Sequence, residues 1–156
     1  MHAPDTRTLT VLLEREEAAR DAVALALRTA ETHLAQAQAQ AEALAAYRRD
    51  YLARWSAQLQ QSAAIEVVHC YRSFMQRLDQ ALEQQAGVIR RAESTVAQRR
   101  TERLAAETRC AAIARLIGRR VEAHRHHEQR LEQRRTDEAA QRSAFARRAE
   151  LPGLAH

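Results

Sequence analysis

The sequence predicts an all-α protein, an elongated antiparallel coiled coil of two helices. Ala, Arg, Leu and Glu account for 90 of the 156 residues, about 58%, which is typical of coiled coils and long helices. Proline occurs only at positions 4 and 152, so no proline interrupts a helix between Asp5 and Leu151. Leu, Ile, Val and Phe make up only about 19% of the chain, which suits narrow seams between helices better than a compact core.

The first helix is expected from about residue 8 to residue 58. Its apolar residues recur at steps of three and four, which is the spacing of a heptad seam. Alanine-rich stretches within the stripe would let a partner helix approach closely. The stripe, with polar residues at three positions, consists of Leu9, Leu13, Glu16, Arg20, Val23, Leu27, Ala30, Leu34, Ala37, Ala41, Leu44, Arg48, Tyr51 and Trp55.

The periodicity is lost over residues 57–66, so we expect the chain to reverse at about 59–65. A second helix then follows over about 66–148, and residues 149–156 form a frayed tail, all within one coiled-coil domain over 1–156. The second stripe runs from Tyr71 to Val96 and is predicted to slip near Arg100 by an extra four-residue step, as at a stutter. It resumes as Leu104, Glu107, Cys110, Ala114, Ile117, Val121, His124, Glu128 and Leu131.

A reversal near residue 61 would place Tyr47 level with Phe74 and Met75. Five aromatic residues would then gather near the reversal, where they either pack the end of the coiled coil or anchor a partner. They are Tyr47, Tyr51, Trp55, Tyr71 and Phe74. A parallel dimer would share much of the same heptad pattern, so the pattern does not decide between a hairpin and a dimer.

Charge is distributed unevenly along the chain. Residues 1–87 carry a net charge of −2, whereas residues 88–156 carry +7. This basic half either attracts an acidic partner or nucleic acid, or is a solvated helix face with interspersed Glu–Arg pairs. Nucleic-acid binding is the alternative from another functional class, but only Phe145 lies among the arginine pairs as a stacking platform for bases, which argues against it.

The remaining composition argues for a cytosolic protein without catalysis. Cys70 and Cys110 would lie roughly 60 Å apart on one helix, which is too far for a disulfide bond. Neither a signal peptide nor an apolar run of about 18 residues is present. His124 and Glu128 share one helix face, but the sequence offers no further ligand set, so we expect solvated side chains and no metal or cofactor. Without a glycine-rich phosphate loop or a nucleophile elbow, we expect no enzymatic activity.

Three segments resemble the FliJ family of flagellar type III export proteins. They are LAAYRRDYLARW at 44–55, YRSFMQRLDQALEQQ at 71–85 and EQRRTDEAAQR at 132–142. They contain a Tyr-x-x-x-Tyr motif, a Phe-x-x-x-Leu-x-x-Ala motif and an Asp-Glu-x-Ala-x-Arg motif in the order that the family has.

This resemblance implies an antiparallel two-helix coiled coil similar to the central stalk of rotary ATPases. Such a stalk inserts in a hexameric export ATPase (FliI-like) and promotes its assembly and activity. It also contacts the export gate protein (FlhA-like) and the export chaperones. The resemblance further implies that the protein is cytoplasmic and lies at the cytoplasmic face of the inner membrane. It implies neither a cofactor nor bound nucleic acid.

The resemblance also implies a gate-binding surface, the partner face. It consists of Gln40, Leu44, Tyr47, Tyr51, Phe74, Leu78, Ala81 and Gln85. Gln85 stands where the family pattern has His. Leu44 and Tyr51 belong to the seam as well, so their role is either structural or contact-making.

The charge asymmetry suggests where the ATPase binds. Basic residues of the second helix are expected to meet acidic loops of the ATPase channel. They are Arg115, Arg119, Arg120, Arg134 and Arg135.

The alternative within the same functional class is the equivalent stalk of a virulence injectisome, the YscO type.

Overall fold

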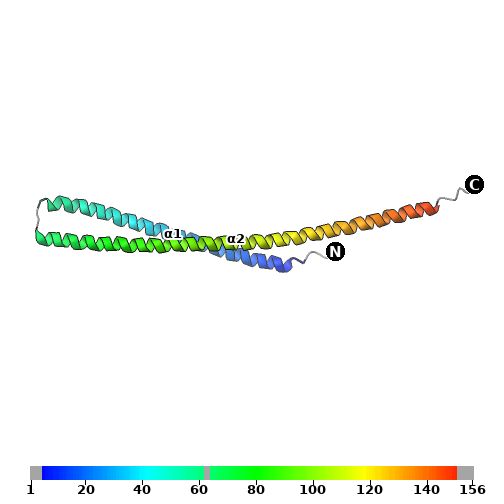
Figure 1. Ribbon diagram of the computed structural model, residues 1–156, viewed down its shortest axis with the longest axis horizontal. Helices are drawn as coiled ribbons and strands as arrows, with labels where there is room; N and C mark the ends of the chain where they lie inside the picture. Colours follow the sequence, from blue (N-terminus) through cyan, green and yellow to red (C-terminus); the bar gives the residue numbers. More distant parts are fainter. Residues whose placement is uncertain (1–4, 62–63, 151–156) are drawn as a thin grey trace, which may run out of the picture. The chain divides into compact units, whose positions relative to one another are not determined.

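A computed structural model describes residues 5–61 and 64–150, which form two α-helices, α1 (Arg7–Leu59) and α2 (Ile65–Glu150) (Figure 1). No strand occurs in these two ranges. The observed helices start one residue before the expected ones and end one or two residues after them, so residues 149 and 150 belong to α2 and not to a tail. Residues 62 and 63 of the expected reversal and 151–156 of the expected tail lie outside the described residues.

The chain forms two compact units, one of residues 17–108 and one of residues 5–16 with 109–150. In the first unit the two helices run antiparallel. Residues with higher numbers on α1 contact residues with lower numbers on α2. Arg100 pairs with Glu31 at 3.7 Å, Gln85 bonds Gln40 at 3.2 Å, and Arg48 bonds Asp79 at 2.7 Å. These contacts lie within one chain, so the fold is a helical hairpin, as the sequence predicts.

The second unit also pairs its segments in antiparallel fashion. Arg109 Nε lies 3.3 Å from Glu16 Oε2, and the Arg120 guanidinium donates to the Asp5 carbonyl at 3.2 Å. Every residue from 132 to 150 is helical and exposed. The single coiled-coil domain expected over residues 1–156 stays a prediction.

The seam of α1 follows the predicted stripe at every position. Leu27, Ala30 and Ala37 are buried, and the other members are half-buried. Leu27, Ala30 and Val96 form a buried cluster against which Leu34 packs. Alanine at two of the most buried positions leaves no long side chain between the helices, so the two backbones can approach closely.

The seam of α2 corrects the expected stutter. Leu104 is 66% exposed, whereas Ala106 is 0% exposed and Cys110 is also buried. Glu107, Ala114 and Val121, which the slipped stripe places in the seam, are exposed. The buried and half-buried seam residues therefore keep the three-and-four spacing without an extra step, with the exposed Arg103 at the position between Arg99 and Ala106. They are Val96, Arg99, Ala106, Cys110, Ile113 and Ile117.

Arginine hides this continuity in the sequence. Arg99 is half-buried in the seam, and its guanidinium pairs with Glu102 at 2.9 Å. Arg103, which is exposed, pairs with Glu107 at 3.0 Å. An arginine can lay its aliphatic stem along apolar surface while its charged end reaches water, so it can occupy a seam position that an apolar residue normally fills.

Two further features concern the whole chain. Cys70 is exposed, Cys110 is buried, and both are free thiols. Within residues 5–61 and 64–150, neither helix has a stretch apolar enough to cross a membrane.

Candidate partner-binding face

The five aromatic residues gather in one cluster near the ends of α1 and α2 that the reversal joins, as predicted. Tyr51 lies at its centre and contacts every other ring. Its ring centroid is 4.2 Å from Phe74, 5.7 Å from Trp55, 6.1 Å from Tyr47 and 6.4 Å from Tyr71. The rings of Tyr47 and Phe74 meet edge to face with centroids 6.2 Å apart, which confirms the prediction that Tyr47 lies level with Phe74. Contacts between offset or edge-to-face rings stabilise the pairing of the two helices here.

The cluster is packed on its inner side and open on its outer side. Tyr47 is 52% exposed, while the other four rings are half-buried. Tyr51 therefore packs within the hairpin, whereas about half of Tyr47 is open to solvent. That these rings also anchor a partner stays a prediction.

Half of the partner face lies beside the seam on one side of the hairpin. Gln40 and Tyr47 each directly precede a seam residue of α1, and Phe74 and Ala81 do the same on α2. In an antiparallel pair these flanking positions of the two helices share one side, and the Tyr47–Phe74 contact agrees with this geometry. We call it the Tyr47 side.

The other half of the partner face lies in the seam itself. Leu78 is 7% exposed, and Leu44, Tyr51 and Gln85 are half-buried. Burial on this scale makes Leu78 a core residue that supports the face from beneath.

Gln85 connects the two halves. Its amide nitrogen donates to the Ala37 carbonyl at 2.9 Å and to Gln40 Oε1 at 3.2 Å. Both bonds cross from α2 to α1, so they fix the register of the helices and hold the Gln40 side chain in place. The side chain that stands in place of the family's His thus has a structural role.

The opposite side of the hairpin is closed by an ion pair. Arg48 Nε donates to Asp79 Oδ1 at 2.7 Å. This hydrogen bond, and next the charge of Asp79, raise the pKa of Arg48 above its ordinary value. Arg48 and Asp79 are therefore engaged with each other, beside the exposed Leu52.

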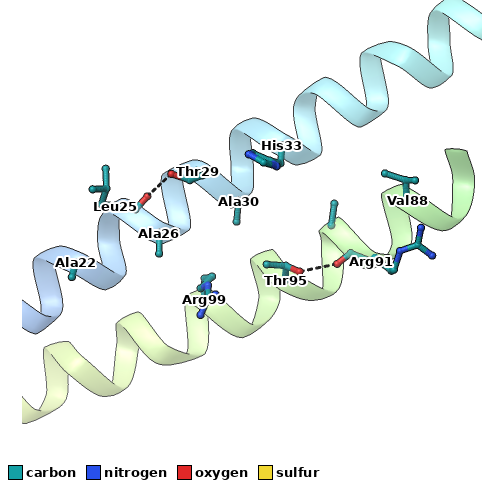
Figure 2. Close-up of a pocket in the computed structure, with 11 residues that line it drawn as sticks. Ala22, Leu25, Ala26, Thr29, Ala30, His33, Val88, Arg91, Thr95 and Arg99 are labelled. Carbon is teal, nitrogen blue, oxygen red and sulfur yellow. Dashed lines mark hydrogen bonds between the residues drawn. The ribbon is translucent and has the colours of Figure 1, made fainter.

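A groove of about 660 Å³ lies between the helices farther from the reversal (Figure 2). It is lined on α1 by Ala22, Leu25, Ala26, Thr29, Ala30 and His33 and on α2 by Val88, Arg91, Ala92, Thr95 and Arg99. Figure 2 shows Ala22, Ala26 and Ala30 pointing from α1 towards α2. Sequence reasoning missed this groove, although the short side chains beside the seam at positions 22, 26 and 29 were a signal for it.

The five arginines expected to meet the ATPase are all exposed and lie in the unit of residues 5–16 with 109–150. Arg120 bonds the Asp5 carbonyl, and the other four have no ion pair with any described residue. At 100° per residue they cover roughly 200° of the helix circumference, so they form a broad basic surface and not a narrow stripe.

His124 and Glu128 lie close to each other on α2. His124 Nε2 lies 3.9 Å from Glu128 Oε1, which agrees with their shared helix face. Within the described part of the chain, no group of three His, Cys, Asp or Glu side chains is placed to hold a metal ion. The neighbouring His126 Nε2 lies 3.1 Å from Glu122 Oε1.

Comparison with known proteins gives one result. The family model described as Flagellar FliJ protein matches residues 6–149, which include nearly all of both helices. None of the curated proteins and none of the solved structures matches the chain.

Proposed function

The chain belongs to the FliJ family, whose members are stalk-like proteins of the flagellar type III export apparatus, and we propose that it is the central stalk and adaptor of that apparatus. In this role it promotes the assembly and activity of the hexameric export ATPase without catalysing a reaction itself. It couples the ATPase to the export gate and binds export chaperones. The match over residues 6–149 carries the proposal, because it covers both helices and not one coiled-coil segment.

The Tyr47 side is the surface we assign to the gate. Tyr47 is half exposed, Gln40 is exposed and held by Gln85, and Phe74 supports the Tyr47 ring. A rigid aromatic ring with a polar end next to an oriented amide is typical of residues that anchor a protein interface. Leu78 and Tyr51 contribute by keeping this surface in shape.

The exposed arginines are the surface we assign to the ATPase. Arg115, Arg119, Arg134 and Arg135 have no ion pair within the described residues, so their charges are available to acidic loops. Residues 132–150 form a helix with every side chain exposed, and 19 residues extend about 28 Å. A slender exposed helix of this length that carries Arg134 and Arg135 fits a channel lined by acidic groups. As the family resemblance implies, the bound stalk would stand at the cytoplasmic face of the inner membrane.

The test is ATP hydrolysis by the cognate flagellar export ATPase with and without the purified chain. We expect faster hydrolysis and a larger share of hexamers in sedimentation. An unrelated antiparallel coiled coil of similar net charge is the control for non-specific effects. The injectisome ATPase serves as a second enzyme.

The outcomes are distinct. Stimulation of the flagellar enzyme alone supports the proposal. A preference for the injectisome enzyme would replace it with the YscO-type alternative, and no binding to either enzyme would contradict a stalk role altogether.

A further inference from the structure

The groove on the hairpin has the dimensions of a helix-binding site. Its lining on α1 runs from Ala22 to His33, which is about 17 Å or three helical turns. Grooves that bind an amphipathic helix are typically read by apolar residues spaced over two to three turns of that helix.

The floor of the groove is apolar, and its two threonine hydroxyls are hydrogen-bonded. Ala22, Ala26 and Ala92 leave the space that longer side chains would fill. The Thr29 hydroxyl donates to the Leu25 carbonyl at 3.1 Å and the Thr95 hydroxyl to the Arg91 carbonyl at 3.0 Å. Both hydroxyls are therefore satisfied within their own helices, and an apolar occupant would leave no buried hydroxyl unpaired.

Two exposed apolar side chains border this floor. Leu25 is 62% exposed on α1, and Val88 is exposed on α2. Beneath the floor, the cluster of Leu27, Ala30 and Val96 already fills the seam. The exposed apolar groups thus have no role in the hairpin core, and covering them would remove apolar area from water.

The charges at the groove are positive. None of its lining residues is acidic, while Arg91, Arg99 and His33 are among them. Glu102 neutralises Arg99, but Arg91 has no ion pair with any described residue. Its guanidinium lies beside Gly87, where an added Cβ would be in ordinary van der Waals contact with Nη1 at 3.6 Å. An acidic group on an occupant would find this charge available.

The groove is continuous with the Tyr47 side. Residues directly before the seam recur every seven positions along both helices. They are Ala26, His33, Gln40 and Tyr47 on α1 and Phe74, Ala81, Val88 and Thr95 on α2. The first two of the α1 set and the last two of the α2 set line the groove, and the others belong to the partner face.

We propose that this groove binds one amphipathic α-helix of a partner protein, with apolar residues against the alanine floor and acidic residues beside Arg91. The bound helix would complete a local three-helix bundle on the hairpin. A second copy of this chain fits less well, because its exposed segment 132–150 holds five arginines against four acidic residues. The inference concerns a surface other than the partner face and does not depend on the stalk function.

The probes are two synthetic fluorescent peptides of 18 residues that differ only in charge. Both carry leucines at steps of three and four, and one has glutamates along the flank where the other has lysines. Fluorescence anisotropy with the full chain measures their binding. We expect the glutamate peptide to bind at least tenfold more tightly than the lysine peptide.

Matched variants locate the binding site. Leu25→Glu should weaken binding of the glutamate peptide at least tenfold, and Arg91→Glu at least fivefold. The controls are Leu104→Glu, at an equally exposed leucine outside the groove, and Arg54→Glu, at an exposed arginine of α1 outside the groove. Both controls should stay within twofold of the parent chain. All four positions are exposed, and circular dichroism checks that each variant is as helical as the parent.

Three results would overturn the inference: equal binding of the two peptides, equal effects of groove and control variants, or a dimer of the chain alone that Leu25→Glu dissociates. The last result would assign the groove to a second copy. Stimulation of the export ATPase by Leu25→Glu, measured in parallel, separates the two proposals. Parent-like stimulation with lost peptide binding supports the groove independently of the stalk role.

Discussion

Gln85 illustrates how one side chain can stabilise the surface to which it belongs. Its amide makes two hydrogen bonds across the hairpin, to a backbone carbonyl of α1 and to Gln40. A resemblance between sequences predicts Gln85 as a contact residue, and this stays a prediction, while the geometry adds a positioning role. The positioning role could not be predicted, because hydrogen-bond partners across a helix pair depend on register, which a list of matching residues does not contain.

Replacing Gln85 by alanine should lower the free energy of unfolding by about 1 kcal/mol, since it removes two bonds from a half-buried site. Urea unfolding followed by circular dichroism measures this change. Gln84→Ala is the matched control, because Gln84 is exposed and bonds no described side chain. Equal stability of the two variants would contradict the positioning role.

Truncation of Leu78 should mainly lower stability, whereas truncation of Tyr47 should mainly weaken gate binding. Leu78→Ala opens a cavity in the seam and should cost about 2–3 kcal/mol of unfolding free energy. Tyr47→Ala removes a half-exposed ring and should cost about 1 kcal/mol, yet weaken gate binding at least tenfold. Unfolding curves and binding to the purified cytoplasmic part of the gate protein provide the two readouts. A Tyr47 variant that binds as well as the parent would remove Tyr47 from the interface.

At the scale of the element, α1 and α2 differ in how well their sequences predict them. The stripe of α1 contains three polar residues, and its apolar neighbours keep the phase, so every member was identified. In α2 the seam holds Arg99 and Arg103 four residues apart, while Leu104 follows directly as an exposed residue. Hydrophobicity alone therefore predicts a seam through Leu104 and a stutter. This prediction is wrong because the arginine side chain is not purely polar and can occupy a seam position.

Two substitutions test the corrected register of α2. Leu104→Ala should change the free energy of unfolding by less than about 0.5 kcal/mol, because Leu104 is 66% exposed. Ala106→Leu should cost about 1–3 kcal/mol, because Ala106 is fully buried and the added atoms have no space. Thermal and urea unfolding of both variants measure the order of these effects. The slipped register predicts the reverse order.

At the scale of the whole molecule, the fold class and the meeting of the aromatic residues could be predicted, because both depend on spacing along each helix and on one reversal. The groove is harder to predict, because it is formed by residues of both helices and depends on their register to within one residue. Short side chains beside the seam indicate it on α1, but the lining also includes Leu25, Val88 and two arginines and carries no recognisable motif.

The surfaces assigned to the gate and to the ATPase should be separable by substitution. The double variant Arg134→Glu/Arg135→Glu should weaken ATPase binding at least tenfold at about 50 mM salt, with a smaller difference at about 500 mM, since salt screens exposed charges. Binding to the gate protein should not change. Arg72→Glu/Arg90→Glu carries the same change in charge on the hairpin of residues 17–108 and should bind the ATPase like the parent. Equal losses in both double variants would indicate an effect of net charge alone.

The two free thiols allow local opening of the helices to be timed without engineering the chain. A thiol reagent reaches Cys70 directly, whereas Cys110 reacts only when the segments around it separate. The ratio of their labelling rates, each corrected for the rate in unfolded chain, gives the opening equilibrium at Cys110. Each tenfold of protection corresponds to about 1.4 kcal/mol. An ATPase that binds residues 109–150 would slow the labelling of Cys110 and leave the labelling of Cys70 unchanged. The ratio of the two rates therefore reports binding of the ATPase within a single chain.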